Sequence, residues 1–334
     1  MRVATSSYYD NTGYAIALAQ SRLLRAQTEI SSNSKLQTAA DNPTDAVQVL
    51  RIGQLLSENT QYRNASDVAK NRLELEETSL SRMADLATRA RELAVQLGDG
   101  SLSTGARQGI GAEADALLQS MAALANTQDA DGGYMFAGNY TKTSPVTSQR
   151  DGSGNIYWIY NGDDTSRTIR VSNTRELPSA SPGSAVFFDV GSTLRDINTG
   201  NAVTYTYTDP SGNTVTPKDS VFAVLQDLVT AAKTPAGTGI GTQVQNVLGR
   251  LSTFQDKLIT ERANVGAHLN EIDAIQTGLD DSDFSLKGLK SALKDVDLAE
   301  AITRFTQQQT VLQATQQSFV RVQGLSLFNY LQSG

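Results

Sequence analysis

The chain has 334 residues, a formal net charge of −7 and only 6% aromatic residues, so bulky core-forming side chains are scarce. It contains no cysteine and a single histidine, His268, which excludes a disulfide framework and the common Cys/His zinc sites. The acidic balance argues against a general nucleic-acid binder, whose affinity depends on Lys and Arg side chains that neutralise phosphates.

The first predicted element is a helix at 11–33. Large and small apolar residues alternate along it at intervals of three and four, namely Ile16, Ala19, Leu23, Ala26 and Ile30. This a/d pattern is typical of a helix that packs closely against another helix. It covers fewer than four heptads, so it predicts a short coiled coil.

A long helix is predicted over 43–97. Asp41 or Asn42 can cap its start, and Pro43 is tolerated in a first helical turn. The glycines of LGDG predict its end. An unbroken helix of this length would extend roughly 80 Å, at about 1.5 Å per residue. A shorter helix at 104–126 is expected to fold back along it.

A small β-rich domain is predicted from 139 to 216, where β-branched and aromatic runs alternate with Gly, Asn, Asp and Pro turns. The expected strands are the runs at 155–164, 167–171, 184–190 and 203–208. DPSGN at 209–213 predicts a hairpin turn.

Helix is predicted again at 221–232 and along an apolar stripe at 243–279. GTGIG at 237–241 lies between them and has the glycines of a phosphate loop. It lacks a preceding strand and a Lys-Ser/Thr pair, so it predicts a linker. A closing helix begins near residue 297.

The predicted fold is mainly α with a β-rich insertion: an elongated antiparallel helical bundle formed by the N- and C-terminal halves, with the terminal helices pairing as a coiled coil. The expected domains are a terminal assembly domain (1–40 plus 297–334), a long helical bundle (41–138 plus 217–296) and an outward-facing β-rich domain (139–216).

Little in the sequence predicts catalysis or metal binding. His268 lies within a continuous helical pattern, and no GxSxG-type nucleophile elbow is present. DADG at 129–132 and DDSD at 280–283 do not match an EF-hand loop, and we interpret both as turns or helix caps. We therefore expect no catalytic, cofactor-binding or metal-binding residues, and no enzyme.

The end of the chain is nearly free of charge. In TQQQTVLQATQQSFVRVQGLSLFNYL, 306–331, only Arg321 is charged. A helix that is apolar on nearly all sides is normally buried. Each buried Leu or Phe contributes about 1.5–3 kcal/mol, so about a dozen exposed ones would offset a whole domain's stability of about 5–15 kcal/mol. Either the ends stay unfolded in the monomer or assembly covers them, and we favour assembly.

Four stretches resemble the FlgL family of hook-associated proteins, the hook–filament junction proteins of bacterial flagella within the flagellin superfamily. They are MRVATSSYYDN at the start, EISSNSKLQTAADNPTDAV at 29–47, NTQDADGGYMFAGNYTKTSPV at 126–146 and DVDLAEAITRFTQQQTVLQATQQSFVRVQGLSLFNYL at 295–331. ERANVGAHLNEID at 261–273 adds to the resemblance, which weakens over 147–216.

The resemblance implies a structural subunit whose terminal helices pair on assembly and line the core of a tube, with the β insertion facing outward. Implied partners are copies of itself in a ring, a neighbouring hook-associated protein on the hook side and flagellin or filament subunits on the other. An export chaperone, FlgN in the family, would hold the C-terminal helix. The flagellar type III apparatus would carry the chain from a transient cytoplasmic stage to an extracellular junction without a cleaved signal peptide.

We expect the contacts between terminal helices and subunits to come from apolar seam residues: Ile16, Leu23, Ile30, Leu298, Ile302, Phe305, Leu312, Phe319, Val322, Leu325, Phe328 and Leu331.

Three alternatives stay open at this point. Flagellin itself shares the helical ends but usually lacks the YMFAG-like segment. A translocator that inserts its ends into a membrane is disfavoured, because the chain has no stretch of ~18 apolar residues and no Lys/Arg flanks at the seam. An enzyme would have to rely on His268 as its base.

Overall fold

The computed structural model describes residues 2–152, 154–191, 194, 205–208, 214–234 and 239–331, and the side chains of 2–9, 208 and 322–331 are outside that description. The chain divides into two compact units. The terminal unit comprises Met1–Asn59 with Asp280–Gly334, and the central unit comprises Thr60–Leu279. The three-domain division expected from the sequence stays a prediction.

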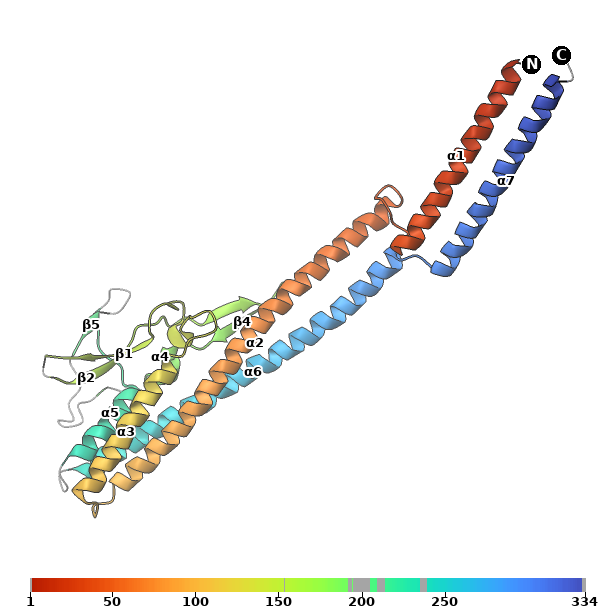
Figure 1. The fold of residues 1–334 in the computed structure, drawn as a ribbon. Helices are drawn as coiled ribbons and strands as arrows, with labels where there is room; N and C mark the ends of the chain where they lie inside the picture. The colour runs from red at the N-terminus through yellow and green to blue at the C-terminus, as the bar shows by residue number, and fades with distance from the viewer. Residues whose placement is uncertain are drawn as a thin grey trace. The chain divides into compact units, whose positions relative to one another are not determined.

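In the terminal unit, α1 (Arg2–Ser32) packs antiparallel to α7 (Leu298–Leu331), so both chain ends lie at the same end of the pair (Figure 1). The predicted first helix is confirmed, and it begins earlier than expected. Asp297 caps α7, since its carboxylate accepts hydrogen bonds from the backbone N–H groups of Ala299 at 2.9 Å and Glu300 at 3.2 Å.

Four helices build the framework of the central unit: α2 (Pro43–Leu97) and α6 (Ile240–Lys294), which also extend into the terminal unit, with α3 (Thr104–Ala125) and α5 (Val221–Lys233). The predicted ends of α2 are confirmed. The side chain of Asn42 accepts a hydrogen bond from the N–H of Asp45 at 3.2 Å, which leaves Pro43 as the first helical residue.

Polar pairs set α2 and α6 antiparallel in the central unit. Nη2 of Arg262 lies 2.6 Å from Oε1 of Glu77, and Nζ of Lys70 lies 2.7 Å from Oδ1 of Asp273. The predicted apolar stripes of the two helices are buried. Fully buried members include Leu73, Leu80, Met83, Leu93, Leu251, Phe254, Leu258 and Ile272.

The β-rich segment forms three separate antiparallel hairpins among the described residues. These are β1 (Val146–Arg150) with β2 (Ile156–Tyr160), β3 (Arg167–Arg170) with β4 (Glu176–Ala180), and β5 (Tyr207–Thr208) with β6 (Thr214–Val215). In the first hairpin Ser148 stands opposite Trp158. The turn expected at 209–213 lies outside the described residues.

The prediction of a strand at 184–190 is wrong. SAVFFDV at 184–190 holds α4 (Gly183–Phe187) instead of a strand. The segment's side chains are buried by aromatic packing: the Phe187 ring lies 5.0 Å from that of Phe136 and 5.7 Å from that of Phe222. A short helix can direct such rings into the core as well as a strand can, so a β-branched and aromatic composition misled the prediction.

The acidic motifs DADG at 129–132 and DDSD at 280–283 have different local structures. The Oδ1 atom of Asp129 accepts hydrogen bonds from the N–H groups of Asp131 at 3.0 Å and Gly133 at 2.9 Å, which confirms a turn. The interpretation of DDSD at 280–283 as a turn or helix cap is wrong, because this segment lies inside α6. There Oδ1 of Asp283 accepts a hydrogen bond from Nδ2 of Asn59 at 2.9 Å.

Candidate assembly surface

The seam of α1 follows the pattern expected from its heptads. Ala19 is 5% exposed and Ala26 8% exposed, so the small residues face the neighbouring helix. Ile16, Leu23 and Ile30 are half-buried on the same stripe. Small residues at one seam position allow two helices to approach closely.

The facing stripe on α7 contains three of the predicted residues. Phe305, Leu312 and Phe319 are half-buried, and Ala301 one turn earlier is fully buried. Sequence reasoning missed Ala301. Its position four residues before Phe305 repeats the 3–4 spacing of α1 and could have identified it.

Other predicted contact residues lie elsewhere. Leu298 is 47% and Ile302 53% exposed, so neither belongs to the buried stripe between α1 and α7 within one chain. The remaining four have backbone positions in α7 but side chains outside the described part: Val322, Leu325, Phe328 and Leu331.

A cluster of charges ties the two terminal helices together. Glu29 on α1 is 7% exposed. Its Oε1 lies 3.3 Å from Nε of Arg25 on the same helix, and its Oε2 lies 3.4 Å from Nη2 of Arg304 on α7. Arg25 also reaches Oδ1 of Asp41 at 2.7 Å. The pairing satisfies a carboxylate that would otherwise be buried without a counter-charge.

The loops beside this cluster are joined through the backbone. Lys35 donates its N–H to the carbonyl oxygen of Lys294 at 2.8 Å, and its Nζ donates to that of Ala292 at 2.6 Å. Asp41 accepts hydrogen bonds from the N–H groups of Thr38 at 2.8 Å and Gln37 at 3.0 Å, and these bonds lower the pKa of its carboxyl. The segment between α1 and α2 is therefore held by several polar contacts.

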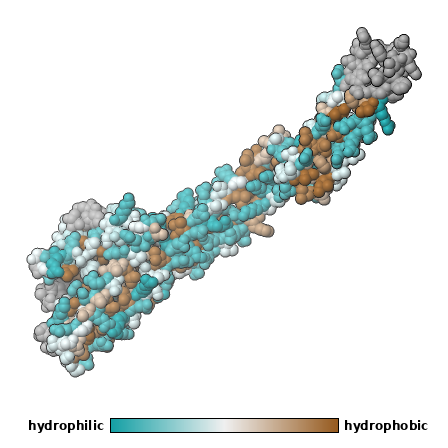
Figure 2. Space-filling view, in the orientation of Figure 1, coloured by the Kyte–Doolittle hydropathy of each residue, from teal (hydrophilic) through white to brown (hydrophobic). Residues whose placement is uncertain are grey.

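Exposed apolar side chains concentrate in the terminal unit. Of the sixteen large hydrophobic side chains that are exposed in the described part of the chain, twelve belong to it. They are Tyr14, Leu18, Leu24, Val47, Leu50, Leu55, Phe284, Leu289, Leu298, Ile302, Val311 and Val320. Figure 2 shows apolar residues gathered over α1 and α7 on one face. An exposed apolar surface of this kind marks an interaction site.

The exposed face of α7 is also nearly free of charge. No charged residue occurs from Phe305 to Val320, and glutamine and threonine fill the positions between the apolar side chains. No helix in the described ranges carries an apolar stretch long enough to cross a membrane.

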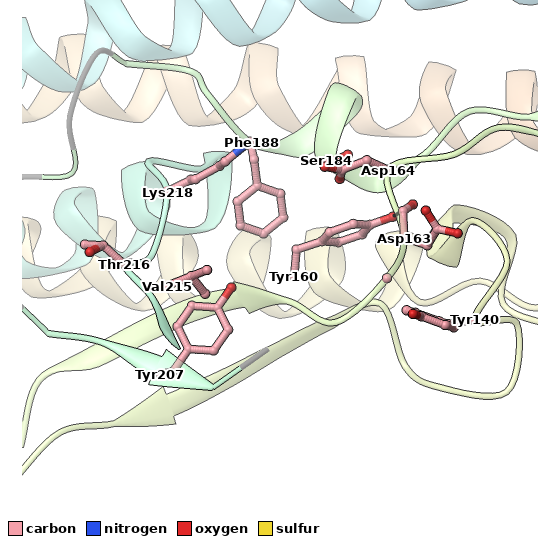
Figure 3. A pocket seen from close by; sticks show the side chains of 11 residues that line it. Tyr140, Tyr160, Asp163, Asp164, Ser184, Phe188, Tyr207, Val215, Thr216 and Lys218 are labelled. Atoms are coloured by element: carbon pink, nitrogen blue, oxygen red, sulfur yellow. Dashed lines mark hydrogen bonds between the residues drawn. The ribbon is translucent and has the colours of Figure 1, made fainter. Parts of the chain in front are cut away.

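The central unit has a pocket of about 320 Å³ in its β-rich part (Figure 3). The hydroxyl of Tyr160 lies there within hydrogen-bonding distance of the carbonyl oxygens of Phe136 (2.9 Å) and Asp163 (3.0 Å), and burial raises its pKa. The carboxylate of Asp163 accepts a hydrogen bond from Nδ2 of Asn139 at 2.8 Å. The polar groups of this pocket therefore hold its loops together.

His268 lies on α6 beside an acidic residue. Its side chain is 30% exposed on α6, and its Nδ1 lies 4.0 Å from Oε2 of Glu271. Among the described residues, no three His, Asp or Glu side chains gather as metal ligands would. The interpretation of His268 as an ordinary helix residue fits this position.

Comparison with known protein families gives matches at both ends of the chain. Residues 3–141 match the model of the bacterial flagellin N-terminal helical region, and residues 248–331 match that of the C-terminal helical region. The two matches contain α1, α2 and α3 on one side and α7 with most of α6 on the other. The helical ends therefore carry the family likeness.

Relatives resemble the chain over nearly its whole length. Flagellar hook-associated protein 3 of Escherichia coli (strain K12) is 28% identical, with 98% of this chain and 99% of that protein covered. The Salmonella typhimurium protein of the same name is 27% identical with the same coverage. The crystal structure of the flagellar junction protein FlgL from Legionella pneumophila gives a TM-score of 0.57 at 21% identity, covering 74% of this chain and 100% of that one.

Proposed function

The chain belongs to the bacterial flagellin family, and from that premise we propose that it is a structural, non-enzymatic subunit of the flagellum that connects hook to filament. The observation that carries the proposal is the concentration of exposed apolar side chains in the terminal unit. Two relatives that cover 98% of the chain, at 27% and 28% identity, are named hook-associated protein 3, which favours the junction over the filament.

Assembly would bury apolar side chains of α1 and α7 that a single chain leaves partly exposed. Two paired helices can bury only one stripe each, and here even the stripe residues Leu23, Phe305 and Leu312 are only half-buried. Helices of neighbouring subunits would complete their burial and cover Leu298 and Ile302. Each large apolar side chain so covered contributes about 1.5–3 kcal/mol.

The partners follow from the same surface. We propose copies of this chain in a ring, a hook-associated protein on one side and filament subunits on the other. Before assembly, a chaperone of the FlgN type would cover α7 in the cytoplasm, and the type III apparatus would export the chain to the extracellular junction. The 305–320 stretch supports this order, because its large apolar side chains have no charged neighbours within the stretch and are only partly buried in one chain.

The test is deletion of the gene, followed by electron microscopy of the cells and an assay for flagellin in the medium. Hooks without filaments, together with shed monomeric flagellin, are the expected result. Hooks without filaments and no flagellin anywhere would identify the filament subunit instead, which is the alternative function. Normal filaments would refute both.

A further inference from the structure

A second pocket lies at the end of the central unit where α2 stops and α6 starts. Its volume is about 310 Å³. The loop after α2 forms one wall, the first turn of α6 another, and Arg107 of α3 a third; the lining residues are Leu97, Gly98, Asp99, Gly100, Arg107, Gly239, Ile240, Gly241 and Thr242. Three segments that are distant in sequence therefore meet here.

Arg107 is the unusual group in this pocket. It is only 6% exposed, and its guanidinium has no hydrogen bond or ion pair with any described residue. Other shielded arginines are paired: Nη1 of Arg250 lies 2.5 Å from Oδ2 of Asp227, and Nη2 of Arg72 lies 3.1 Å from Oδ2 of Asp129. A buried guanidinium without a counter-charge calls for an anion.

Backbone donors line the same pocket. Thr242 and Gln243 donate their N–H groups to the carbonyl oxygen of Gly239, at 3.1 and 3.2 Å. Ile240 and Gly241 are the first two residues of α6, so their N–H groups belong to those at a helix start that have no acceptor inside the helix. Backbone donors at a helix start, together with the helix dipole, favour a bound anion.

The pocket also contains a carboxylate, that of Asp99, which would repel a bound anion. Asp99 lines the pocket, and its Oδ1 accepts hydrogen bonds from the N–H of Ser101 at 2.9 Å and from its hydroxyl at 2.8 Å. These bonds lower the pKa of Asp99 and hold its carboxylate within its own loop. No hydrogen bond or ion pair joins Asp99 to Arg107 in the described part of the chain.

We propose that this pocket binds a small oxyanion of the phosphate class between the guanidinium of Arg107 and the first turn of α6. The glycines at 237–241 carry no Lys-Ser/Thr pair, but α3 supplies the cation that the sequence around them lacks. Gly239 has a φ of 72°, in the left-handed region, and this conformation suits glycine at the turn into α6. The bound anion would join the loop after α2 to the start of α6.

The test is calorimetric titration of the purified full-length chain with inorganic phosphate, with chloride at equal ionic strength as the reference. We expect saturable binding that is at least tenfold weaker in Arg107→Met and intermediate in Arg107→Lys. The matched control is Arg91→Met, which removes an exposed arginine that reaches Oε1 of Gln255 at 3.3 Å and should bind phosphate as the parent does.

Two results would overturn the site. If phosphate did not bind saturably to the parent chain, the pocket would not be an anion site and the role of Arg107 would be structural. Equal binding by the parent and Arg107→Met would mean an adventitious ion only. Circular dichroism of each variant shows whether it is folded, and Arg107→Lys keeps the charge if Arg107→Met does not fold. The assay uses the monomer, so it does not depend on the junction function.

Discussion

Arg304 of α7 lies against Glu29 of α1, with 3.4 Å between Nη2 and Oε2. The two residues are far apart in sequence, and their contact joins the first and last helices of the chain. Glu29 is the more buried partner, and Arg25 pairs with its other oxygen. The contact therefore gives the helix pair a polar anchor beside its apolar seam.

Removing Arg304 should loosen this helix pair. In Arg304→Met we expect a loss of about 0.5–1 kcal/mol, because the arginine is half-exposed and solvent screens the pair. Amide exchange should become faster in α1 and α7 and stay unchanged in α2 and α6. Arg321→Met is the matched control, since Arg321 is exposed on the same helix. Uniform acceleration along the whole chain would contradict the local role.

A charge in the seam should prevent assembly. Phe305→Asp or Leu312→Asp places a carboxylate in a stripe that neighbouring helices would cover, which costs several kcal/mol, on the order of 2–7. We expect loss of incorporation into flagella, measured by complementation of the deletion strain, while the central unit keeps its helical circular dichroism. Val95→Asp, at a position exposed in the central unit, serves as the control. Normal incorporation of the seam variants would refute the seam assignment.

Glu76 should make the central unit sensitive to pH. The pKa of its carboxyl is raised from 4.5 to about 7, mainly by burial, and the nearby carboxylates of Glu261 and Glu77 also raise it. The hydrogen bond that its Oε1 accepts from the N–H of Ser181 at 3.1 Å acts in the opposite direction. The folded state thus favours the protonated form. This contribution to stability is complete below pH 4.5 and is lost as the pH rises through 7, a change of about 3 kcal/mol.

The measurement is the unfolding free energy of Glu76→Gln and the parent chain from pH 4.5 to 8.5. The variant should be the more stable chain above pH 7 and equal to the parent near pH 4.5, because the amide keeps an acceptor without a charge. Glu74→Gln, an exposed change on the same helix, should track the parent throughout. Parallel curves for Glu76→Gln and the parent would show that Glu76 does not titrate in this range.

Gly138 ends the YMFAG segment in a conformation that favours glycine. Its φ is 61°, and a Cβ there would collide with the carbonyl oxygen of Asp163. Gly138→Ala should therefore lower the unfolding free energy by about 1–2 kcal/mol or more. Gly109→Ala is the control: it lies within α3 with open space around it, so it should be neutral or stabilising by up to about 1 kcal/mol. Urea unfolding distinguishes the two.

Local sequence signals predicted the long helices well. Asn42 and Pro43 define the start of α2, and the glycines after Leu97 define its end, because caps and breakers act within a few residues. The strand expected at 184–190 was wrong, since packing against Phe136 and Phe222 decided its conformation. Long-range partners decide such short segments, and a single sequence does not contain them in a readable form.

The candidate surface was only partly predictable for the same reason. Heptad spacing predicted Leu23, Phe305 and Leu312, which are half-buried, and their contact with other subunits stays a prediction. It did not separate Ala301, which is buried, from the exposed Ile302 next to it. The pocket around Arg107 could not be predicted, since it depends on three distant segments that meet in space.

The uncharged stretch of α7 has a consequence for the conditions in which the protein can work. The side chains of residues 305–320 contain no group that titrates near neutral pH and no charge for an ion pair that salt would screen. A joint built on residues 305–320 should hold in fresh water and in brine alike, and in acidic as in alkaline surroundings.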